Sequence, residues 1–90
     1  MLKPIYIKLF RKQFKLMQKR GLDVDKLGKI MEMIINEQPL PPERNNHPLH
    51  GEWKGMLECH IEPNWLLIYE IDKSAGEVTF HRTGSHSDLF

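Results

Sequence analysis

The chain has 90 residues, of which 40% are hydrophobic and 28% charged, so it has the length and composition of one ordinary globular domain. Its single cysteine excludes an internal disulfide framework, and no apolar run approaches the roughly twenty residues that a membrane span needs. We therefore expect one domain over residues 1–90, located in the cytoplasm and without membrane contact. The net charge of +1 hides an asymmetry, because residues 1–30 carry nine Lys and Arg against two Asp, whereas residues 31–90 carry four against ten Asp and Glu. The basic N-terminal third is suited to a polyanionic partner.

The first part of the sequence predicts a short strand, Leu2–Tyr6, followed by two helices. The first helix starts after Ile7, which is a poor N-cap, and ends at Gly21. The second starts at Asp23, which can cap it, and ends near Asn36. Apolar residues recur at helical spacing, at Phe10, Phe14 and Met17 in the first helix and at Val24, Leu27, Met31 and Ile34 in the second. Basic residues follow the opposite side of the first helix: Lys8, Arg11, Lys12, Lys15 and Lys19.

The remaining sequence predicts an irregular segment and three strands. Residues 37–51 hold four of the six prolines, which argues against regular structure there. Strands are expected over Trp53–Ile61, Trp65–Ile71 and Val78–Thr83, separated by two turn sequences. The order β-α-α-β-β-β indicates an α+β domain in which a helical hairpin covers one face of an antiparallel sheet and leaves the other face open.

Strand alternation predicts which side chains share a face. Lys54, Glu58 and His60 fall on the polar side of their strand, and Cys59 falls on the other side. By the same rule, Arg82 shares a face with Val78 and Phe80. We expect no metal site, because the spacing of the candidate ligands His47, His50, Cys59, His60 and His86 matches no usual zinc pattern and Cys59 points away from His60.

Four sequence blocks together carry a family resemblance. They are His47-Pro48-Leu49 with Gly51-x-Trp53-Lys54-Gly55, then Glu58-Cys59-His60-Ile61-Glu62-Pro63, then Trp65-Leu66-Leu67-Ile68-Tyr69, and finally Arg82 to Phe90. In this order they resemble bacterial toxins of the RelE/ParE superfamily, and among these the YafQ type is the most similar. The resemblance extends over essentially the whole chain, including the helix pair, and is far more specific than one short motif.

The resemblance implies a function. Toxins of this type are ribosome-dependent mRNA endonucleases, and each is neutralised by a cognate antitoxin. The toxin would contact operator DNA only as part of its complex with the antitoxin. The resemblance implies cleavage of mRNA in the ribosomal A site by attack of a ribose 2′-OH on the adjacent phosphate, without metal or other cofactor. His60 and His86 would be the general acid and base in an undecided order, His47 would bind or protonate the phosphate, and Arg82 would stabilise transition-state charge. Phe90 would stack on a base, and Glu58, Asn64 and Lys54 complete the expected substrate-binding set.

Two departures from the YafQ pattern bear on the site. Asn64 stands where the pattern usually has Asp, and Met56-Leu57 replaces a usual Tyr-Arg pair. Two other functions therefore remain open. One is a weakened or non-enzymatic homologue that binds its antitoxin for operon repression. The other is a ParE-like inhibitor of DNA gyrase, a class that lacks the nuclease histidines.

Overall fold

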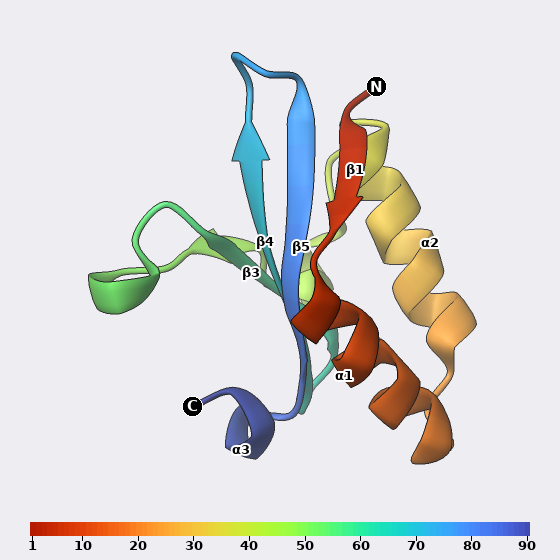
Figure 1. The fold of residues 1–90 in the computed structure, drawn as a ribbon. Coiled ribbons are helices and arrows are strands. Elements are labelled where there is room, and N and C mark those ends of the chain that lie inside the picture. The colour runs from red at the N-terminus through yellow and green to blue at the C-terminus, as the bar shows by residue number, and fades with distance from the viewer.

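The computed structural model describes all 90 residues as one sheet with a pair of helices against it (Figure 1). The sheet has five strands in the order β1-β5-β4-β3-β2. No helix is both long and apolar enough to cross a membrane. The elements are β1 (Lys3–Tyr6), α1 (Lys8–Lys19), α2 (Val24–Ile35), η1 (Pro42–Arg44), β2 (His47–Pro48), η2 (Gly51–Trp53), β3 (Leu57–Glu62), β4 (Trp65–Asp72), β5 (Glu77–Gly84) and α3 (His86–Leu89).

The two predicted helices are confirmed, and their apolar sides form the core with one face of the sheet. Ile7 precedes α1 without a side-chain cap, whereas the Asp23 carboxylate accepts a hydrogen bond from the Asp25 amide at 3.1 Å. Fourteen buried residues form one cluster between the helices and the sheet: Leu2, Phe10, Met17, Leu27, Ile30, Met31, Ile34, Cys59, Ile61, Trp65, Leu67, Tyr69, Val78 and Phe80. Both helices lie on the same side of the strands in Figure 1.

The α+β class is confirmed, but the prediction of a wholly antiparallel sheet is wrong for one strand. β3, β4 and β5 pair antiparallel through short turns, whereas β1 pairs parallel to β5. A parallel neighbour requires a long connection, and here nearly the whole chain separates β1 from β5. β1 therefore closes the edge of the sheet beside the helices.

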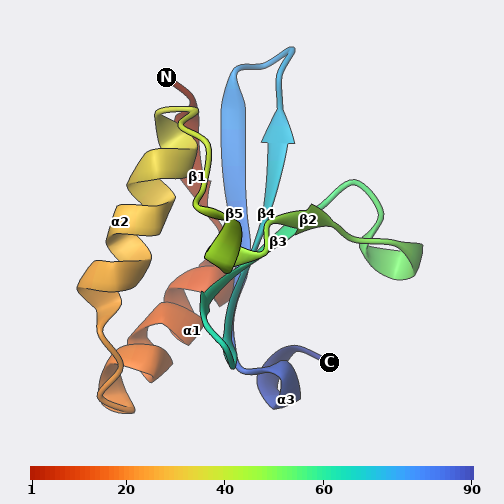
Figure 2. The ribbon, with the colours of Figure 1, turned by 180° about the vertical axis from the view of Figure 1, so that it is seen from behind.

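The proline-rich segment contains short elements that the sequence did not predict. It runs from the end of α2 down to η1 and then enters the two-residue strand β2, which pairs antiparallel with β3 (Figure 2). The strand predicted to start at Trp53 begins instead at Leu57, because η2 occupies the preceding residues. Gly51 and Gly55 flank η2 with φ of 67° and 94°, a region that residues with a Cβ rarely adopt, and this double reversal turns Trp53 out of the strand.

A β-bulge in β5 changes which face its last residues occupy. Tyr69 pairs with Phe80, but the next residue of β4, Ile68, pairs with Arg82, so His81 is an extra residue. Val78 and Phe80 remain in the core. Arg82 is turned to the other face, and the prediction that it shares a face with them is wrong. We call this face, opposite α1 and α2, the active-site face.

Candidate active site

The active-site face carries a row of polar side chains above a buried apolar floor. Cross-strand pairing places Glu58 opposite Ile68, and Ile68 opposite Arg82, while His60 lies opposite Leu66. Leu66 and Ile68 are fully buried yet stand outside the main core cluster. The prediction of an open second face is therefore wrong in its middle, where the side chains of the site cover Leu66 and Ile68.

His47 and His60 flank one buried carboxylate. Glu58 Oε1 lies 3.5 Å from Nε2 of each ring, and the two ring centroids are 6.4 Å apart. Glu58 is only 6% exposed. His47 has an acceptor on its other side as well, because its Nδ1 lies 2.7 Å from the carbonyl oxygen of Asn45, a residue whose left-handed backbone (φ 47°) turns that carbonyl toward the ring. His47 thus lies between a carboxylate and a backbone carbonyl oxygen.

His86 joins this pair from the C-terminal end of the chain. Its ring centroid is 5.9 Å from that of His60, so His60 stands between the other two histidines. Asn64 Oδ1 accepts the backbone N–H of His86 at 3.1 Å and lies 2.9 Å from its Nδ1. Because an amide oxygen only accepts, Nδ1 carries the proton of this hydrogen bond, and Nε2 is the ring nitrogen without a partner. The Asn that replaces the usual Asp therefore holds His86 by hydrogen bonds without adding negative charge.

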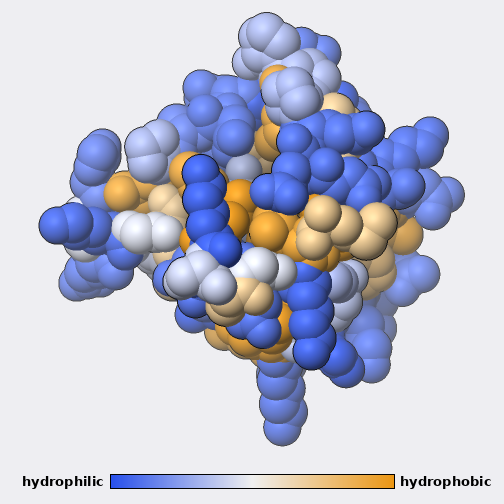
Figure 3. Space-filling view, turned by 90° about the horizontal axis from the view of Figure 1, so that it is seen from above, coloured by the Kyte–Doolittle hydropathy of each residue, from blue (hydrophilic) through white to orange (hydrophobic).

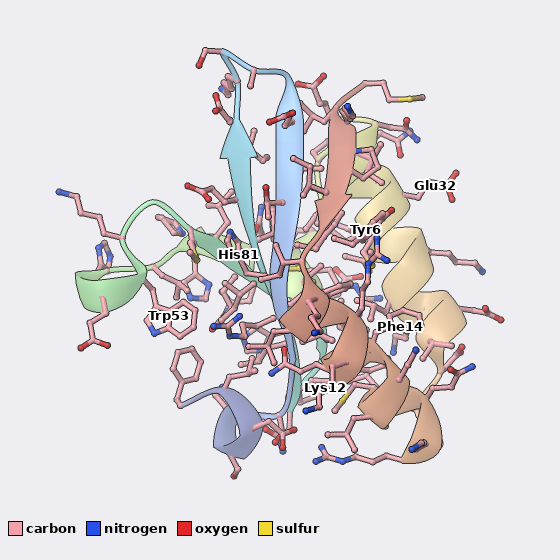
Figure 4. The ribbon with its side chains drawn as sticks, viewed as in Figure 1. Tyr6, Lys12, Phe14, Glu32, Trp53 and His81 are labelled. Carbon is pink, nitrogen blue, oxygen red and sulfur yellow. The ribbon has the colours of Figure 1, made fainter.

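Trp53 organises the remaining part of the site. The guanidinium carbon of Arg82 lies 5.7 Å from the centroid of the Trp53 ring, and Arg82 Nη1 donates to the His81 carbonyl at 3.0 Å. Phe90 meets the same ring edge-on, with centroids 5.7 Å apart, and is 60% exposed. Figure 4 shows Trp53 and His81 on the opposite side of β5 from Phe14. Phe90 does not close the core, and Trp53, which the sequence placed in a core strand, belongs to the site.

The C-terminal helix that carries His86 is held from both sides. Ser85 and Asp88 form a capping box, in which Asp88 Oδ2 accepts from the Ser85 amide at 2.8 Å. Asp88 also accepts two hydrogen bonds from Arg20 at the end of α1, at 2.7 and 3.0 Å. The Arg20 hydrogen bond, followed by those from Ser85, holds the pKa of the Asp88 carboxyl well below its usual range. This clamp, which the sequence did not reveal, fixes the position of His86 and Phe90.

Most of the predicted site residues are brought together, and one lies apart. The interactions just described connect them in two groups: His47, Glu58, His60, Asn64 and His86 form one, and Arg82 and Phe90 contact Trp53 in the other. α3 joins the two groups, because it begins at His86 and is followed by Phe90. Lys54 is exposed just after η2 and forms no ion pair. It follows Trp53 in the chain, so its ammonium group is near the site, but no partner holds the side chain in one position. The arrangement offers three imidazole rings that can transfer protons, one guanidinium group and one exposed aromatic ring. These side chains lie on the face of the sheet formed by Leu66 and Ile68.

Comparison with known proteins identifies the family. The family model described as "Bacterial toxin of type II toxin-antitoxin system, YafQ" matches residues 2–90. The chain belongs to the YafQ toxin family. It is 44% identical over 82 residues to the mRNA interferase toxin YafQ of Escherichia coli K12, covering 90% of this chain and 87% of that protein. The resemblance found in the sequence is thereby confirmed.

Solved structures of similar toxins share the fold. YafQ in the E. coli DinJ–YafQ complex has a TM-score of 0.92 at 41% identity, covering 100% of this chain and 99% of that chain. A copper-bound mutant toxin from Helicobacter pylori has a TM-score of 0.93 at 37% identity, with both chains fully covered. In this YafQ-family toxin, no three His, Cys, Asp or Glu side chains are grouped as they would be to hold a metal ion.

Two other surfaces of the toxin lie away from the histidines. The predicted basic stripe of α1 is confirmed as solvent-exposed. An apolar groove of about 640 Å³ runs between β1, α1 and α2, and its lining includes Tyr6, Phe10, Phe14, Met31 and Ile35, with Glu32 also present. Tyr6, Phe14 and Glu32 are labelled on this side in Figure 4. From above, hydrophobic side chains reach the surface between hydrophilic ones (Figure 3). The groove shares no residue with the histidine site.

Proposed function

We propose that this YafQ-family toxin is a ribosome-dependent mRNA endonuclease that inhibits translation by cutting mRNA in the ribosomal A site. The observation that carries the proposal is the row of three histidines, in which the ring centroid of His60 lies within 6.4 Å of both neighbouring centroids, on the face of the sheet that also carries Arg82. An E. coli relative at 44% identity bears the name mRNA interferase toxin, which supports the same activity. Proton transfer and charge stabilisation are the two demands of RNA transesterification, and these side chains can meet both.

The proposed reaction needs one base, one acid and stabilisation of negative charge. The 2′-oxygen forms a bond to the adjacent phosphorus while the bond from phosphorus to the 5′-oxygen breaks. The base takes the proton of the 2′-OH, and the acid gives a proton to the departing 5′-oxygen. The products are a 2′,3′-cyclic phosphate and a 5′-OH. The proposal assigns no step to a metal or other cofactor, because imidazoles and a guanidinium supply each requirement.

His86 is assigned as the general base. Its Nδ1 proton is directed to Asn64, which leaves Nε2 as a lone pair on an exposed ring. Asn64 thus serves as the positioning residue of the base, and no carboxylate is needed to fix the tautomer. An Asp at this position would add charge to the site but would present the same acceptor to Nδ1.

His60 is assigned as the general acid and His47 as a phosphate-binding cation. His60 Nε2 lies 3.5 Å from Glu58 Oε1, and this buried carboxylate would attract the protonated ring of a general acid. His47 lies between Glu58 and the Asn45 carbonyl, a setting that suits the imidazolium. Arg82, held against Trp53, is assigned to the developing charge on the phosphate oxygens.

Substrate binding is assigned to the exposed ring of Phe90 and to Lys54. The Phe90 side chain is exposed beyond its contact with Trp53, and an exposed aromatic ring can stack on any RNA base. Lys54 would contact a phosphate. The exposed basic residues of α1 suit ribosomal RNA, with an affinity that falls as salt rises.

The proposed partners follow from the family. A cognate antitoxin is expected, since YafQ of E. coli is found in a DinJ–YafQ toxin–antitoxin complex. Contact with operator DNA is proposed only through such a complex, and action on ribosomes places the toxin in the cytoplasm. The whole chain, residues 1–90, is proposed to act as a single domain.

The test uses a reporter mRNA on purified ribosomes, with 5′ ends mapped by primer extension. Wild type should cut only when ribosomes are present, and His60→Gln and His86→Gln should each reduce the rate by about 10²-fold or more. The roles are separated by an mRNA with sulfur in place of the bridging 5′-oxygen, because a thiolate leaves without protonation. This substrate should restore cutting by His60→Gln and not by His86→Gln.

Three results would contradict the proposal. If the sulfur-containing mRNA restores cutting by His86→Gln and not by His60→Gln, then His86 is the general acid and His60 the general base. No ribosome-dependent cut by soluble wild type, with unimpaired growth of cells that express it without antitoxin, would favour the repressor homologue. Gyrase inhibition with intact mRNA would favour the ParE-like function.

A further inference from the structure

A hollow lies at the open edge of β4, and its lining includes Pro48 and Leu57, the chain neighbours of His47 and Glu58. Pairing of β3 with β4 ends where Leu57 meets Tyr69, so the last residues of β4, Glu70 to Asp72, have no strand on that side. The hollow there has a volume of about 720 Å³. Its lining combines apolar and small residues with one group of charged ones, and it includes Gly55, Met56, Ile71, Glu70, Asp72 and Lys73.

Glu70 lines this hollow and also lies on the face of the sheet that carries the candidate active site. It lies two residues from Ile68 on the same strand and therefore on the active-site face, about 7 Å along the sheet from the row that contains Arg82. Its Oε1 lies 3.2 Å from Nε2 of His81, the extra residue of the bulge. The His81 side chain is 18% exposed and that of Glu70 is 47% exposed. His81 therefore holds one oxygen of a carboxylate whose other oxygen is free.

The charges around the hollow restrict what can enter it. Asp72 Oδ1 is occupied by the Ser74 hydroxyl at 2.8 Å and the Ala75 amide at 3.1 Å. These hydrogen bonds lower the pKa of the Asp72 carboxyl, so it is ionised at neutral pH. Lys73 is the one cation in the lining, and it is exposed at the turn. Two carboxylates against one lysine repel an RNA phosphate, so a group that enters must donate hydrogen bonds and carry no negative charge.

We propose that the hollow binds the base of a nucleotide next to the cleaved bond, with Glu70 as the residue that selects guanine. This inference rests on the proposed ribonuclease function. A carboxylate can accept two parallel hydrogen bonds even when one of its oxygens already contacts His81, because each oxygen has two lone pairs. Only guanine offers two adjacent donors, N1–H and N2–H₂, on its Watson–Crick edge. Adenine and cytosine offer one amino group there, and uracil offers one imino group. His81 is a positioning residue that fixes the carboxylate.

The experiment supplies ribosomes with an mRNA pool in which one codon and the nucleotide after it are randomised, and sequences the new 5′ ends. The measured quantity is the ratio of cuts next to guanine to cuts next to each other base. Wild type should favour guanine at one of the two flanking positions by about tenfold, the size of a good bidentate base contact. Glu70→Gln and Glu70→Lys should each bring this ratio close to one, and His81→Phe should lower it partly.

The control is Glu77→Gln, which removes a carboxylate at the start of β5, opposite Asp72, and should leave the ratio unchanged. If wild type cuts but shows no guanine preference, or if both Glu70 variants keep it, the base-binding inference is wrong and the nuclease proposal stands. If wild type does not cut at all on ribosomes, the nuclease proposal itself fails.

Discussion

The clamp on α3 gives the most direct test of how the fold supports the site. α3 has only four residues, too few for a helix that is stable by itself in water. It is held by the Ser85–Asp88 capping box and by Arg20. Asp88→Ala removes the acceptor for the Ser85 amide and the partner of Arg20. Because α3 carries His86 and ends at Phe90, its opening removes the proposed base from the site.

The size of the effect follows from the two interactions that Asp88→Ala abolishes. The capping interaction contributes about 1 kcal/mol, and the Arg20 ion pair adds less because both side chains are partly exposed. A change of about 1 kcal/mol alters the ratio of open to closed α3 about fivefold. We expect the rate of ribosome-dependent cutting to fall by up to this factor, with little change in melting temperature, because only the last turn opens.

The pH dependence of the clamp has a definite sign. The folded state holds the pKa of Asp88 below its ordinary value of about 3.9, so the clamp contributes fully above that pH and is lost as the pH falls toward the folded-state pKa. The amide resonance of Ser85, which donates to Asp88 Oδ2, should therefore show no titration of Asp88 between pH 5 and 8 in wild type.

The control is Asp23→Ala, which removes another capping carboxylate, at the start of α2, and should leave the cutting rate within about twofold. Unchanged activity in Asp88→Ala, or an equal loss in both variants, would refute the argument that the clamp positions His86.

Two further predictions test the same packing. In Gly84→Ala, the added Cβ would lie 2.9 Å from the Asp88 Cβ and 3.0 Å from its Oδ2, so Asp88 must shift. The cutting rate should fall about as much as in Asp88→Ala, and the double variant should lose little more; additive losses would show that the two residues act separately. Burial raises the pKa of the Cys59 thiol to about 12, so Cys59 should resist a thiol reagent at pH 8 and react once guanidinium unfolds the chain. Rapid labelling of the folded protein would contradict the burial of Cys59 in the core.

The local sequence was sufficient to predict the elements in which a regular apolar pattern extends over many residues. The apolar spacing of α1 and α2 and the caps at Gly21 and Asp23 predicted both helices closely, because these signals depend on residues three or four positions apart. The face of Glu58 and His60 was likewise predictable, since both lie within a regular part of β3. The start of that strand was not, because Gly51 and Gly55 reverse the chain around Trp53.

The three-dimensional relations of the site depend on how the elements pack. A one-residue bulge at His81 makes Arg82 face the histidines, and strand alternation alone predicted the opposite face. The contacts of Asn64 with His86 and of Arg20 with Asp88 join residues 22 and 68 positions apart. No local pattern encodes such contacts, because they form only when separate strands and helices pack.

Residue types and their local order were therefore enough to predict the class of fold, the family and the identity of the candidate catalytic side chains, because the chain carries this information directly. Three features came from the packed fold instead: β1 lies parallel to β5, Trp53 supports Arg82 and Phe90, and Glu58 lies between His47 and His60. The first depends on how the ends of the chain pack, and the second on the reversal of the chain at η2. The third depends on the register of β2 and β3, where a shift of one residue would move a side chain to the opposite face of the sheet.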